Sequence, residues 1–182
     1  MTWTRSVRRN GRRHKLVFLD ESAVTTNMVR PYGWGPRGER IKDYQTLSSW
    51  KTYSLIAAIK STGWAGSMLI PGAVDGDAFA TYLEKCLVPT LKAGDIVLLD
   101  NVPFHHDPRV ADILMGAGAR VKYLPPYSPD FNPIEHAFSA LKSFLRKLHE
   151  RNFDALVKGI GKAQQDTARQ TYANYFQACL NL

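Results

Sequence analysis

Two short runs of the sequence, at residues 16–20 and 95–100, each hold four apolar residues that an aspartate follows directly. Runs of this length and composition predict strands buried inside a sheet. The aspartate breaks the apolar pattern, and an unpaired carboxylate is costly to bury. At the carboxyl end of a strand, however, its side chain can face the crevice where open α/β sheets place their sites. Asp20 and Asp100 are therefore the first candidate site residues.

The rest of the chain predicts a mixed α/β domain, with helices packed on a central sheet. Apolar and β-branched runs bounded by turn residues indicate further strands, and helical spacing with capping residues indicates the helices. Residues 30–40 carry several glycine and proline turn signals, as in a hairpin or a folded loop. The further strands are expected at 52–60, 63–72 and 119–125, and the helices at 75–89, 108–118, 132–150 and, as one or two closing helices, 153–180.

A third acid, Glu135, lies in the first turn of the clearest predicted helix, where Asn132 is expected to be the N-cap and Pro133 to take the first helical position. If the two aspartate-ended strands are neighbours and this helix crosses their ends, Asp20, Asp100 and Glu135 converge. Three carboxylates in one place repel one another unless divalent cations are bound, and such a cluster suits two Mg²⁺ ions about 3.5–4 Å apart. Taken one by one, Glu135 would only interact with the dipole of its helix, and Asp20 and Asp100 would only begin turns after their strands. The spacing of the three acids alone leaves both interpretations open.

Composition excludes several classes of protein. The chain has 182 residues, of which 45% are hydrophobic, which suits one domain with a sizeable core and rules out wholesale disorder. No apolar run reaches the roughly 18–20 residues of a membrane helix, and the first twenty residues lack the apolar stretch of a secretory signal. Two cysteines are too few for a disulfide framework or a thiolate zinc site. These features favour a soluble, intracellular, basic domain.

The positive charge is concentrated at the start of the chain. The net charge is +8, and residues 1–19 contribute +6 of it without a single acid before Asp20. The stretch 1–15 has no apolar periodicity, so we expect a basic N-terminal arm outside the folded domain. Clustered arginines suit contacts with nucleic-acid phosphates, although a solvated tail is the plainer alternative.

Two blocks of the sequence resemble a known family. DNVPFHH at 100–106 and LPPYSPDFNPIE at 124–135 resemble the DDE transposases of the Tc/mariner superfamily, while DES at 20–22 and GWGPRG at 33–38 are similar to its bacterial insertion-sequence branch. Thirty-four residues separate Asp100 from Glu135, which is similar to the spacing in that family. The resemblance covers about residues 16–150, and the second block is its most specific part.

The resemblance implies an α/β, RNase H-like (retroviral-integrase-like) fold over residues 16–182, a mixed central sheet flanked by helices, with the last helices closing the domain. It implies a DNA transposase that cleaves and transfers strands in cut-and-paste transposition. Asp20, Asp100 and Glu135 would be its catalytic residues and the ligands of two Mg²⁺ ions, for which Mn²⁺ can substitute. The implied partners are transposon-end DNA, a TA-containing target, a second copy of the chain on DNA, and a separate N-terminal half with helix-turn-helix domains. No membrane is implied, and the expected location is the nucleoid of a bacterial-type cytoplasm.

Further residues are assigned to the edge of this site or to DNA. Glu21 follows Asp20 directly, so in a strand the two side chains point to opposite faces, and Glu21 is expected to support the site and not to bind a metal. The two adjacent histidines have no further zinc ligand at suitable spacing, and the resemblance places them beside the second aspartate. The expected active-site rim is Asn101, His105, His106 and Asn132. The expected DNA contacts are Arg5, Arg8, Arg9, Arg12, Arg13, Trp34, Arg37, Lys142 and Arg146, although a loop aromatic can also cover a core and a basic helix face can simply be solvated.

Two other functions compete with the transposase. One is a structure-selective nuclease on the same RNase H-like fold, which would cut DNA without joining it. The other is a non-catalytic remnant of a transposase that only binds DNA. A metal titration separates the enzyme from the binding module, and a strand-transfer assay separates the transposase from the nuclease.

Overall fold

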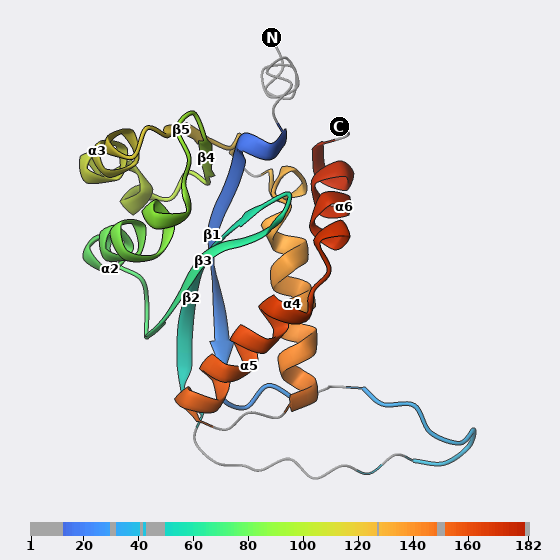
Figure 1. Ribbon diagram of the computed structural model, residues 1–182. Helices are drawn as coiled ribbons and strands as arrows, with labels where there is room; N and C mark the ends of the chain where they lie inside the picture. The colour runs from blue at the N-terminus through green and yellow to red at the C-terminus, as the bar shows by residue number, and fades with distance from the viewer. Residues whose placement is uncertain are drawn as a thin grey trace.

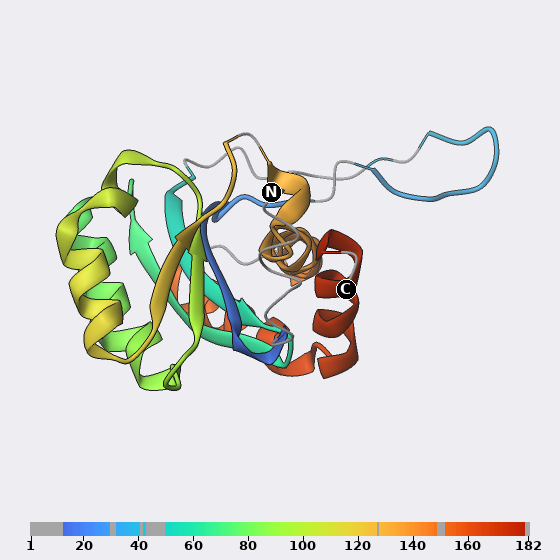
Figure 2. The same ribbon diagram turned by 90° about the horizontal axis from the view of Figure 1, so that it is seen from above.

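A computed structural model describes residues 13–29, 32–40, 42, 50–126, 128–148 and 152–180. Its centre is a five-stranded sheet that lies between two layers of helices (Figure 1, Figure 2). This arrangement confirms the expected mixed sheet flanked by helices. The strands are β1 (Leu16–Thr25), β2 (Thr52–Lys60), β3 (Gly63–Pro71), β4 (Ile96–Leu99) and β5 (Arg120–Tyr123), and their order across the sheet is β3-β2-β1-β4-β5.

The two strands that lead to the candidate aspartates are neighbours and run parallel. β1 and β4 pair with Phe18 opposite Leu98. Counting two residues further along the chain from each of them places Asp20, inside β1, level with Asp100, which directly follows β4. On its other side β1 pairs with β2, and β2 pairs with β3, both antiparallel. The sheet thus brings together two acids that are eighty positions apart in the chain.

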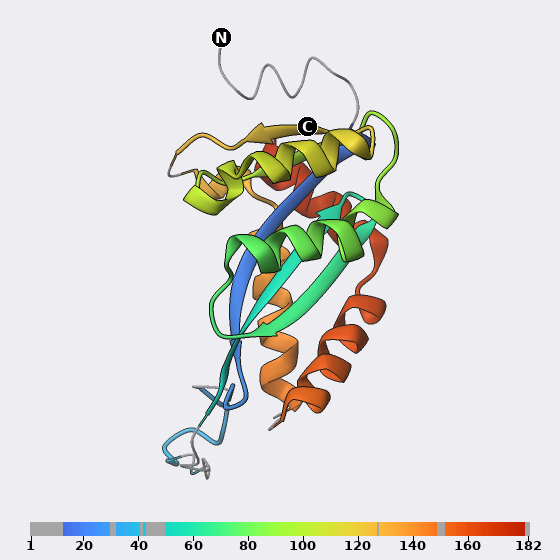
Figure 3. The same cartoon turned by 90° about the vertical axis from the view of Figure 1, so that its left-hand side faces the viewer.

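Helices cover both faces of the sheet (Figure 1, Figure 3). The pleat of β1 sends alternate side chains into two separate cores. Phe18 meets Phe176 edge to face, with ring centroids 5.2 Å apart, whereas Leu19 packs on the opposite side with Phe79 and Tyr82. The helices of the Phe18 side are α4 (Ile134–Leu148), α5 (Phe153–Asp166) and α6 (Arg169–Leu180), and those of the Leu19 side are α2 (Gly76–Tyr82) and α3 (Pro108–Gly116).

Strand β1 extends beyond the apolar run that predicted it. The expected strand ended at Asp20, whereas β1 continues to Thr25. The backbone ladder with β2 runs on until Thr25 stands opposite Thr52, and backbone pairing does not depend on apolar side chains. The other strands agree with the expectation to within two residues at each end.

The helices on the Leu19 side begin where the sequence places their caps. Asp75 accepts a hydrogen bond from the amide of Ala78 (2.8 Å) at the start of α2, and Asp107 caps α3 with Pro108 in the first helical position. The segment after α2 continues as a π-turn and a 3-10 turn and does not form one helix as far as Pro89. Pro89 fits there because the first positions of a helical turn need no backbone donor.

Residues 32–40, in the connection from β1 to β2, form a described stretch outside the sheet and the helices. Residues 32–40 extend away from the body of the protein (Figure 1, Figure 2) and contain no strand, so this described part is a loop and not a hairpin. Trp34 is fully exposed and Arg37 is exposed as well. The alternative, that this loop aromatic covers a core, does not hold for Trp34, and its contact with DNA stays a prediction.

The basic arm lies largely outside the described residues, which begin at Arg13. The backbone enters β1 through a short 3-10 turn, Arg13–Lys15. Arg5, Arg8, Arg9 and Arg12, predicted to contact DNA, are not among the described residues. None of the described helices is both long enough and apolar enough to cross a membrane.

Candidate active site

One hollow of about 470 Å³ lies where the middle of β1 and the carboxyl end of β4 meet the first turn of α4. Asp20 comes from β1, Asp100 directly follows β4, and Glu135 is the second residue of α4. All three acids that were expected to converge thus border the same space. The lining residues are Asp20, Asp100, Asn101, Leu124, Pro125, Pro126, Ser128, Asn132 and Glu135.

Two donors hold the carboxylate of Asp20 in place. The backbone N–H of Glu21 donates to Oδ1 (2.8 Å), and the side-chain amide of Asn132 donates to Oδ2 (2.8 Å). Even so, burial raises the pKa of Asp20 from 3.8 to about 7, and the negative charges of Glu21, Asp100 and Glu135 add to the rise. A proton or a cation bound at this carboxylate relieves both effects.

Asp100 is held from behind by a histidine. His105 lies in the helical turn η4 (Pro103–His106), and its Nδ1 is 2.7 Å from Oδ1 of Asp100. The hydrogen bond from His105 keeps the pKa of Asp100 below its ordinary value, which is the reverse of the change at Asp20. Near pH 7 Asp100 is therefore ionised, while Asp20 is divided between its two forms.

The imidazole of His105 lies between two carboxylates. Its side chain is fully buried, and Nε2 is 3.1 Å from Oε1 of Glu21. Burial alone would lower the pKa of His105, but the hydrogen bonds to Asp100 and Glu21 outweigh it and raise the pKa to about 9. The ring is consequently a cation at neutral pH and donates from both nitrogens. His105 was expected at the rim of the site, whereas η4 turns its ring inward, where it is fully buried against Asp100.

The first turn of α4 presents Glu135, whose side chain is exposed. Its carboxylate makes no hydrogen bond or ion pair with another described residue. Asn132 was expected to cap this helix, and that expectation is wrong, because its amide nitrogen donates to Asp20 and its oxygen has no partner. A hydrogen bond to a charged acceptor is roughly twice as strong as one between neutral groups, so the carboxylate outcompetes the helix end for this side chain.

The donors around the hollow suit a hard divalent cation, although their present spacing does not complete a set of ligands. Carboxylate oxygens are the ligands that Mg²⁺ and Mn²⁺ prefer. The repulsion that raises the pKa of Asp20 is the effect that such a cation relieves. Among the described residues, however, no three histidine, cysteine, aspartate or glutamate side chains stand close enough together to hold one ion. The exposed side chain of Glu135 is the one with room to close that gap.

The other residues predicted for the rim differ in their position. Asn101 lines the hollow, and its amide donates to the carbonyl of Leu124 (2.6 Å). His106 is exposed and does not line the hollow; it stacks on Tyr123, with ring centroids 4.2 Å apart. Asn101 therefore belongs to the hollow, whereas His106 lies beside it.

Four of the described residues predicted to contact DNA, Trp34, Arg37, Lys142 and Arg146, do not line the hollow. Trp34 and Arg37 lie on the extended loop, and Lys142 and Arg146 lie on α4, where both are half-buried. Arg13 begins the turn before β1. Their role in DNA binding stays a prediction.

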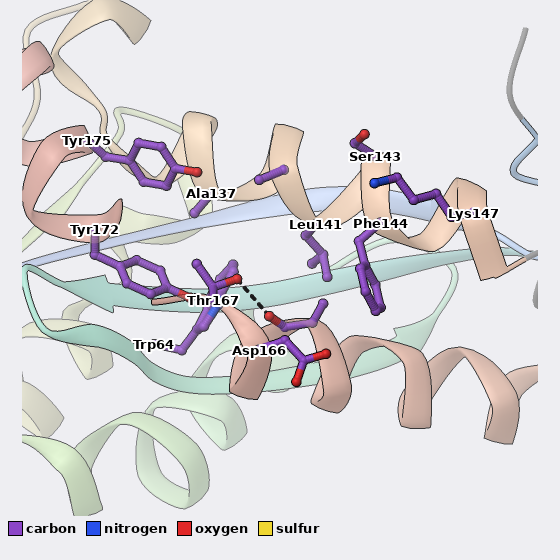
Figure 4. A pocket seen from close by; sticks show the side chains of 12 residues that line it. Trp64, Ala137, Leu141, Ser143, Phe144, Lys147, Asp166, Thr167, Tyr172 and Tyr175 are labelled. Carbon is purple, nitrogen blue, oxygen red and sulfur yellow. Dashed lines mark hydrogen bonds between the residues drawn. The ribbon is translucent and has the colours of Figure 1, made fainter. Parts of the chain in front are cut away.

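A second hollow, of about 320 Å³, lies between β3 and the helices α4, α5 and α6 (Figure 4). None of the three candidate acids lines it, so it is separate from the acidic hollow. Aromatic side chains from three elements form much of its wall. These are Trp64 from β3, Phe144 from α4, and Tyr172 and Tyr175 from α6.

The two contacts by which His105 connects Glu21 to Asp100 were not predicted from the sequence. Two signals were present, an acid next to Asp20 on the other face of the strand and a histidine five residues after Asp100. Neither reveals that η4 folds the imidazole back onto Glu21, which is 84 positions away in the chain. Only the packing of η4 against β1 makes the link.

Comparisons with known proteins agree with this geometry. The model of a family described as DDE superfamily endonuclease matches residues 15–157. Among solved structures, the Mos1 transposase paired-end complex with left transposon end has a TM-score of 0.80 at 19% identity, over 98% of this chain and 56% of that chain. The Mos1 strand transfer complex has a TM-score of 0.78 at 20% identity, over 98% and 55% of the two chains. The catalytic domain of Mos1 mariner transposase has a TM-score of 0.75 at 19% identity, over 98% and 83%.

These likenesses establish the fold, which is the expected RNase H-like fold of a transposase catalytic domain. The chain spans about half the length of the Mos1 chains in the two complexes. Mos1 paired-end complexes have also been solved with Mn and with Mg. No curated protein matches the chain in sequence.

Proposed function

This chain belongs to the DDE superfamily of endonucleases, and we propose that it is the catalytic domain of a DNA transposase. In this role it cuts a DNA strand at a transposon end and joins the freed 3′ end to target DNA. The observation that carries the proposal is the hollow shared by Asp20, Asp100 and Glu135, where the two aspartates stand side by side on neighbouring parallel strands. The likeness of its fold to a transposase strand transfer complex adds support.

We propose further that the three carboxylates bind two Mg²⁺ ions, for which Mn²⁺ can substitute. Bound there, the ions would supply the positive charge that activates the attacking oxygen and stabilises the leaving 3′ oxygen. The support is the chemistry of the donors, together with the solved Mos1 complexes that contain Mn or Mg.

The chain's own residues prepare this site. The amide of Asn132 and the backbone N–H of Glu21 orient Asp20 before any ligand arrives. Because the pKa of Asp20 is about 7 and a ligand carboxylate must be ionised, cation binding near neutral pH releases a proton from Asp20. Asp100 is already ionised through its hydrogen bond with His105. Glu135 starts from a rigid helix with an exposed side chain and completes the set.

DNA is the proposed substrate and partner of the chain. The net charge of +8 favours association with phosphates. The arginines of the arm, the exposed loop with Trp34 and Arg37, and the basic residues Lys142 and Arg146 are the proposed contacts. We propose a dimer on paired DNA ends, with recognition of the terminal repeat supplied by a separate helix-turn-helix half. The Mos1 paired-end complex with left transposon end supports DNA as the partner by analogy.

The variant Glu135→Gln tests the proposal. The amide keeps the size and the hydrogen bonding of the carboxylate but loses the charge that a hard cation requires. We expect a folded protein with the melting temperature of the wild type, whose Mg²⁺-dependent nicking of plasmid DNA is reduced by orders of magnitude. Glu84→Gln is the matched control, because Glu84 is an exposed glutamate in the turn after α2, and this variant should nick like the wild type.

Each outcome identifies a function. A Glu135→Gln protein that nicks like the wild type would remove Glu135 from the catalytic set. Nicking by the wild type without strand transfer would identify a nuclease. A wild-type chain that shows no Mg²⁺-dependent nicking, even with the helix-turn-helix half supplied separately, would be a DNA-binding remnant.

A further inference from the structure

We propose that Glu21 and His105 form a positioning pair that holds Asp100 ready for cation binding, so that Glu21 acts from behind the site and is not a fourth metal ligand. The inference rests on the proposed function, because it concerns the same hollow. It is carried by the contacts of one buried imidazole.

His105 joins the two acids through opposite corners of its ring. Nδ1 lies 2.7 Å from Oδ1 of Asp100, and Nε2 lies 3.1 Å from Oε1 of Glu21. The side chain of His105 has no exposed surface, whereas Glu21 keeps 17% and Asp100 39% of theirs. A buried ring with a hydrogen bond at each nitrogen is held in one orientation.

The surroundings of His105 determine where the ring stands. The rings of Phe79 and Phe104 pack against it, with centroids 4.6 Å and 4.5 Å away. The hydroxyl of Tyr123 on β5 donates to the backbone carbonyl of His105 (3.0 Å), and the His105 N–H donates to the carbonyl of Val102 (3.1 Å). Both the backbone and the ring are therefore fixed by the fold, before any ligand is present.

This arrangement decides which oxygen of Asp100 is left for a cation. Oδ1 receives His105 Nδ1, and the amide of Val102 lies 3.4 Å from the same oxygen. Oδ2 has no donor among the described residues, so it stays available. Glu21 is kept from the cation because the pleat of β1 directs it to the face opposite Asp20. Groups that orient a metal ligand from behind change metal affinity by about 10- to 100-fold.

A purely structural ion pair is the competing explanation, in which His105 only stabilises the fold. Two substitutions separate the explanations, because each keeps a different half of the imidazole. The amide nitrogen of asparagine lies as many bonds from Cα as Nδ1, and that of glutamine lies as many bonds away as Nε2. His105→Asn therefore keeps the donor for Asp100, whereas His105→Gln keeps the donor for Glu21.

The test is a calorimetric titration of the full chain with MnCl₂, together with urea unfolding of each metal-free variant. We expect His105→Asn, which loses only the contact with Glu21, to bind Mn²⁺ about 10-fold more weakly than the wild type, and His105→Gln, which loses the donor for Asp100, to bind it about 100-fold more weakly. A structural pair would instead lower the stability of both variants and leave their Mn²⁺ affinities equal. Equal affinities of the two variants would overturn the proposal.

A variant of the other acid gives a second measurement that does not depend on the folding of the histidine variants. Glu21→Met removes the acceptor of Nε2 and keeps the length of the side chain, and we expect about 10-fold weaker Mn²⁺ binding. Wild-type binding by Glu21→Met would contradict the proposal. Glu84→Gln removes an exposed carboxylate far from the ring and serves as the control, with unchanged Mn²⁺ binding.

Asp100→Asn separates the failure of this inference from the failure of the proposed function. If Asp100→Asn binds Mn²⁺ like the wild type, the metal site itself is misassigned and both ideas fall. If Asp100→Asn loses binding while His105→Gln and Glu21→Met keep it, the site stands and only the positioning pair is rejected.

Discussion

Asp20→Asn is expected to make the metal-free protein more stable at pH 8, although it removes a candidate metal ligand. Burial and the neighbouring carboxylates raise the pKa of Asp20 from 3.8 to about 7 in the folded protein. Each pKa unit is worth about 1.4 kcal/mol, so ionised Asp20 destabilises the folded state by at most about 4 kcal/mol at pH 8. Solvent in the hollow screens part of this effect, and we expect the neutral variant to gain about 2 kcal/mol.

The site can accept an amide at position 20 without losing hydrogen bonds. The amide oxygen keeps the bond from the backbone N–H of Glu21. A half-turn of the Asn132 amide brings its oxygen, which has no partner in the wild type, to the new N–H at position 20. The substitution therefore removes a buried charge at nearly unchanged volume and keeps the number of hydrogen bonds, with the amide nitrogen of Asn132 left without a partner in place of its oxygen.

The gain has a defined dependence on pH. Below pH 3.8 Asp20 is protonated in the folded and in the unfolded protein, so it costs the folded wild type no stability. As the pH rises from 3.8 toward 7, Asp20 ionises first in the unfolded protein, and the folded wild type loses stability. The stability difference between Asp20→Asn and the wild type should therefore stay below about 1 kcal/mol at pH 4 and reach its plateau above about pH 7. Urea unfolding of both proteins in EDTA, at several values across this range, measures the difference. His105 titrates in both proteins, so its own effect largely cancels.

Added Mg²⁺ should reduce or reverse this difference at pH 8. A cation that binds only the folded wild type stabilises it by mass action, whereas the variant has lost a ligand charge. Equal stability of the two metal-free proteins at pH 8 would refute the account of Asp20 as a desolvated carboxylate.

Three further substitutions test the packing of the sheet and its helices by urea unfolding. Lys60→Met should cost about 3 kcal/mol, because Lys60 Nζ lies 2.8 Å from Asp95 Oδ2 and only 4% of the Asp95 side chain is exposed. Adding Asp95→Leu to this variant should restore part of the lost stability. If it restores none, the loss does not come from an unpaired buried charge. Gly66→Ala should cost about 3 kcal/mol or more, since its φ is +102° and a Cβ would lie 2.5 Å from a backbone carbonyl oxygen of the π-turn after α2. Gly72→Ala, at φ +77° with open space around it, is the matched control at about 1 kcal/mol, and equal losses would reject the steric argument. Tyr172→Phe should leave the stability within about 1 kcal/mol of the wild type, because the buried Tyr172 hydroxyl lies near Thr167 and Trp64 without a well-directed hydrogen bond to either; a larger loss would mean that the hydroxyl is bonded.

Much of the fold could be predicted from the sequence, because its signals are local. The apolar runs at 16–19 and 96–99 are buried strands as expected. Asp75 and Asp107 cap their helices through hydrogen bonds that reach only two or three residues along the chain. The blocks at 100–106 and 124–135 indicated the family, and the family model confirms it. Signals of this range depend on neighbours in sequence and are therefore visible without a structure.

The hydrogen-bond partners of Asn132 and His105 could not be predicted, because they lie far away along the chain. By local pattern Asn132 is a good helix cap, and His105 was expected at the rim of the site. Asn132 instead donates to Asp20, 112 positions away, and His105 joins Glu21, 84 positions away. A buried carboxylate attracts whichever donor the packing brings near it, and no short pattern encodes which one that is.

The amino-acid sequence by itself determined the strands, most of the helices and the three acids of the site. Only the tertiary structure decided the register that sets Asp20 level with Asp100, and the donors that each one receives. Those donors have opposite consequences, since the pKa of Asp20 rises to about 7 while that of Asp100 falls. Ionisation depends on burial and on nearby charge in three dimensions, which segments distant in the chain supply.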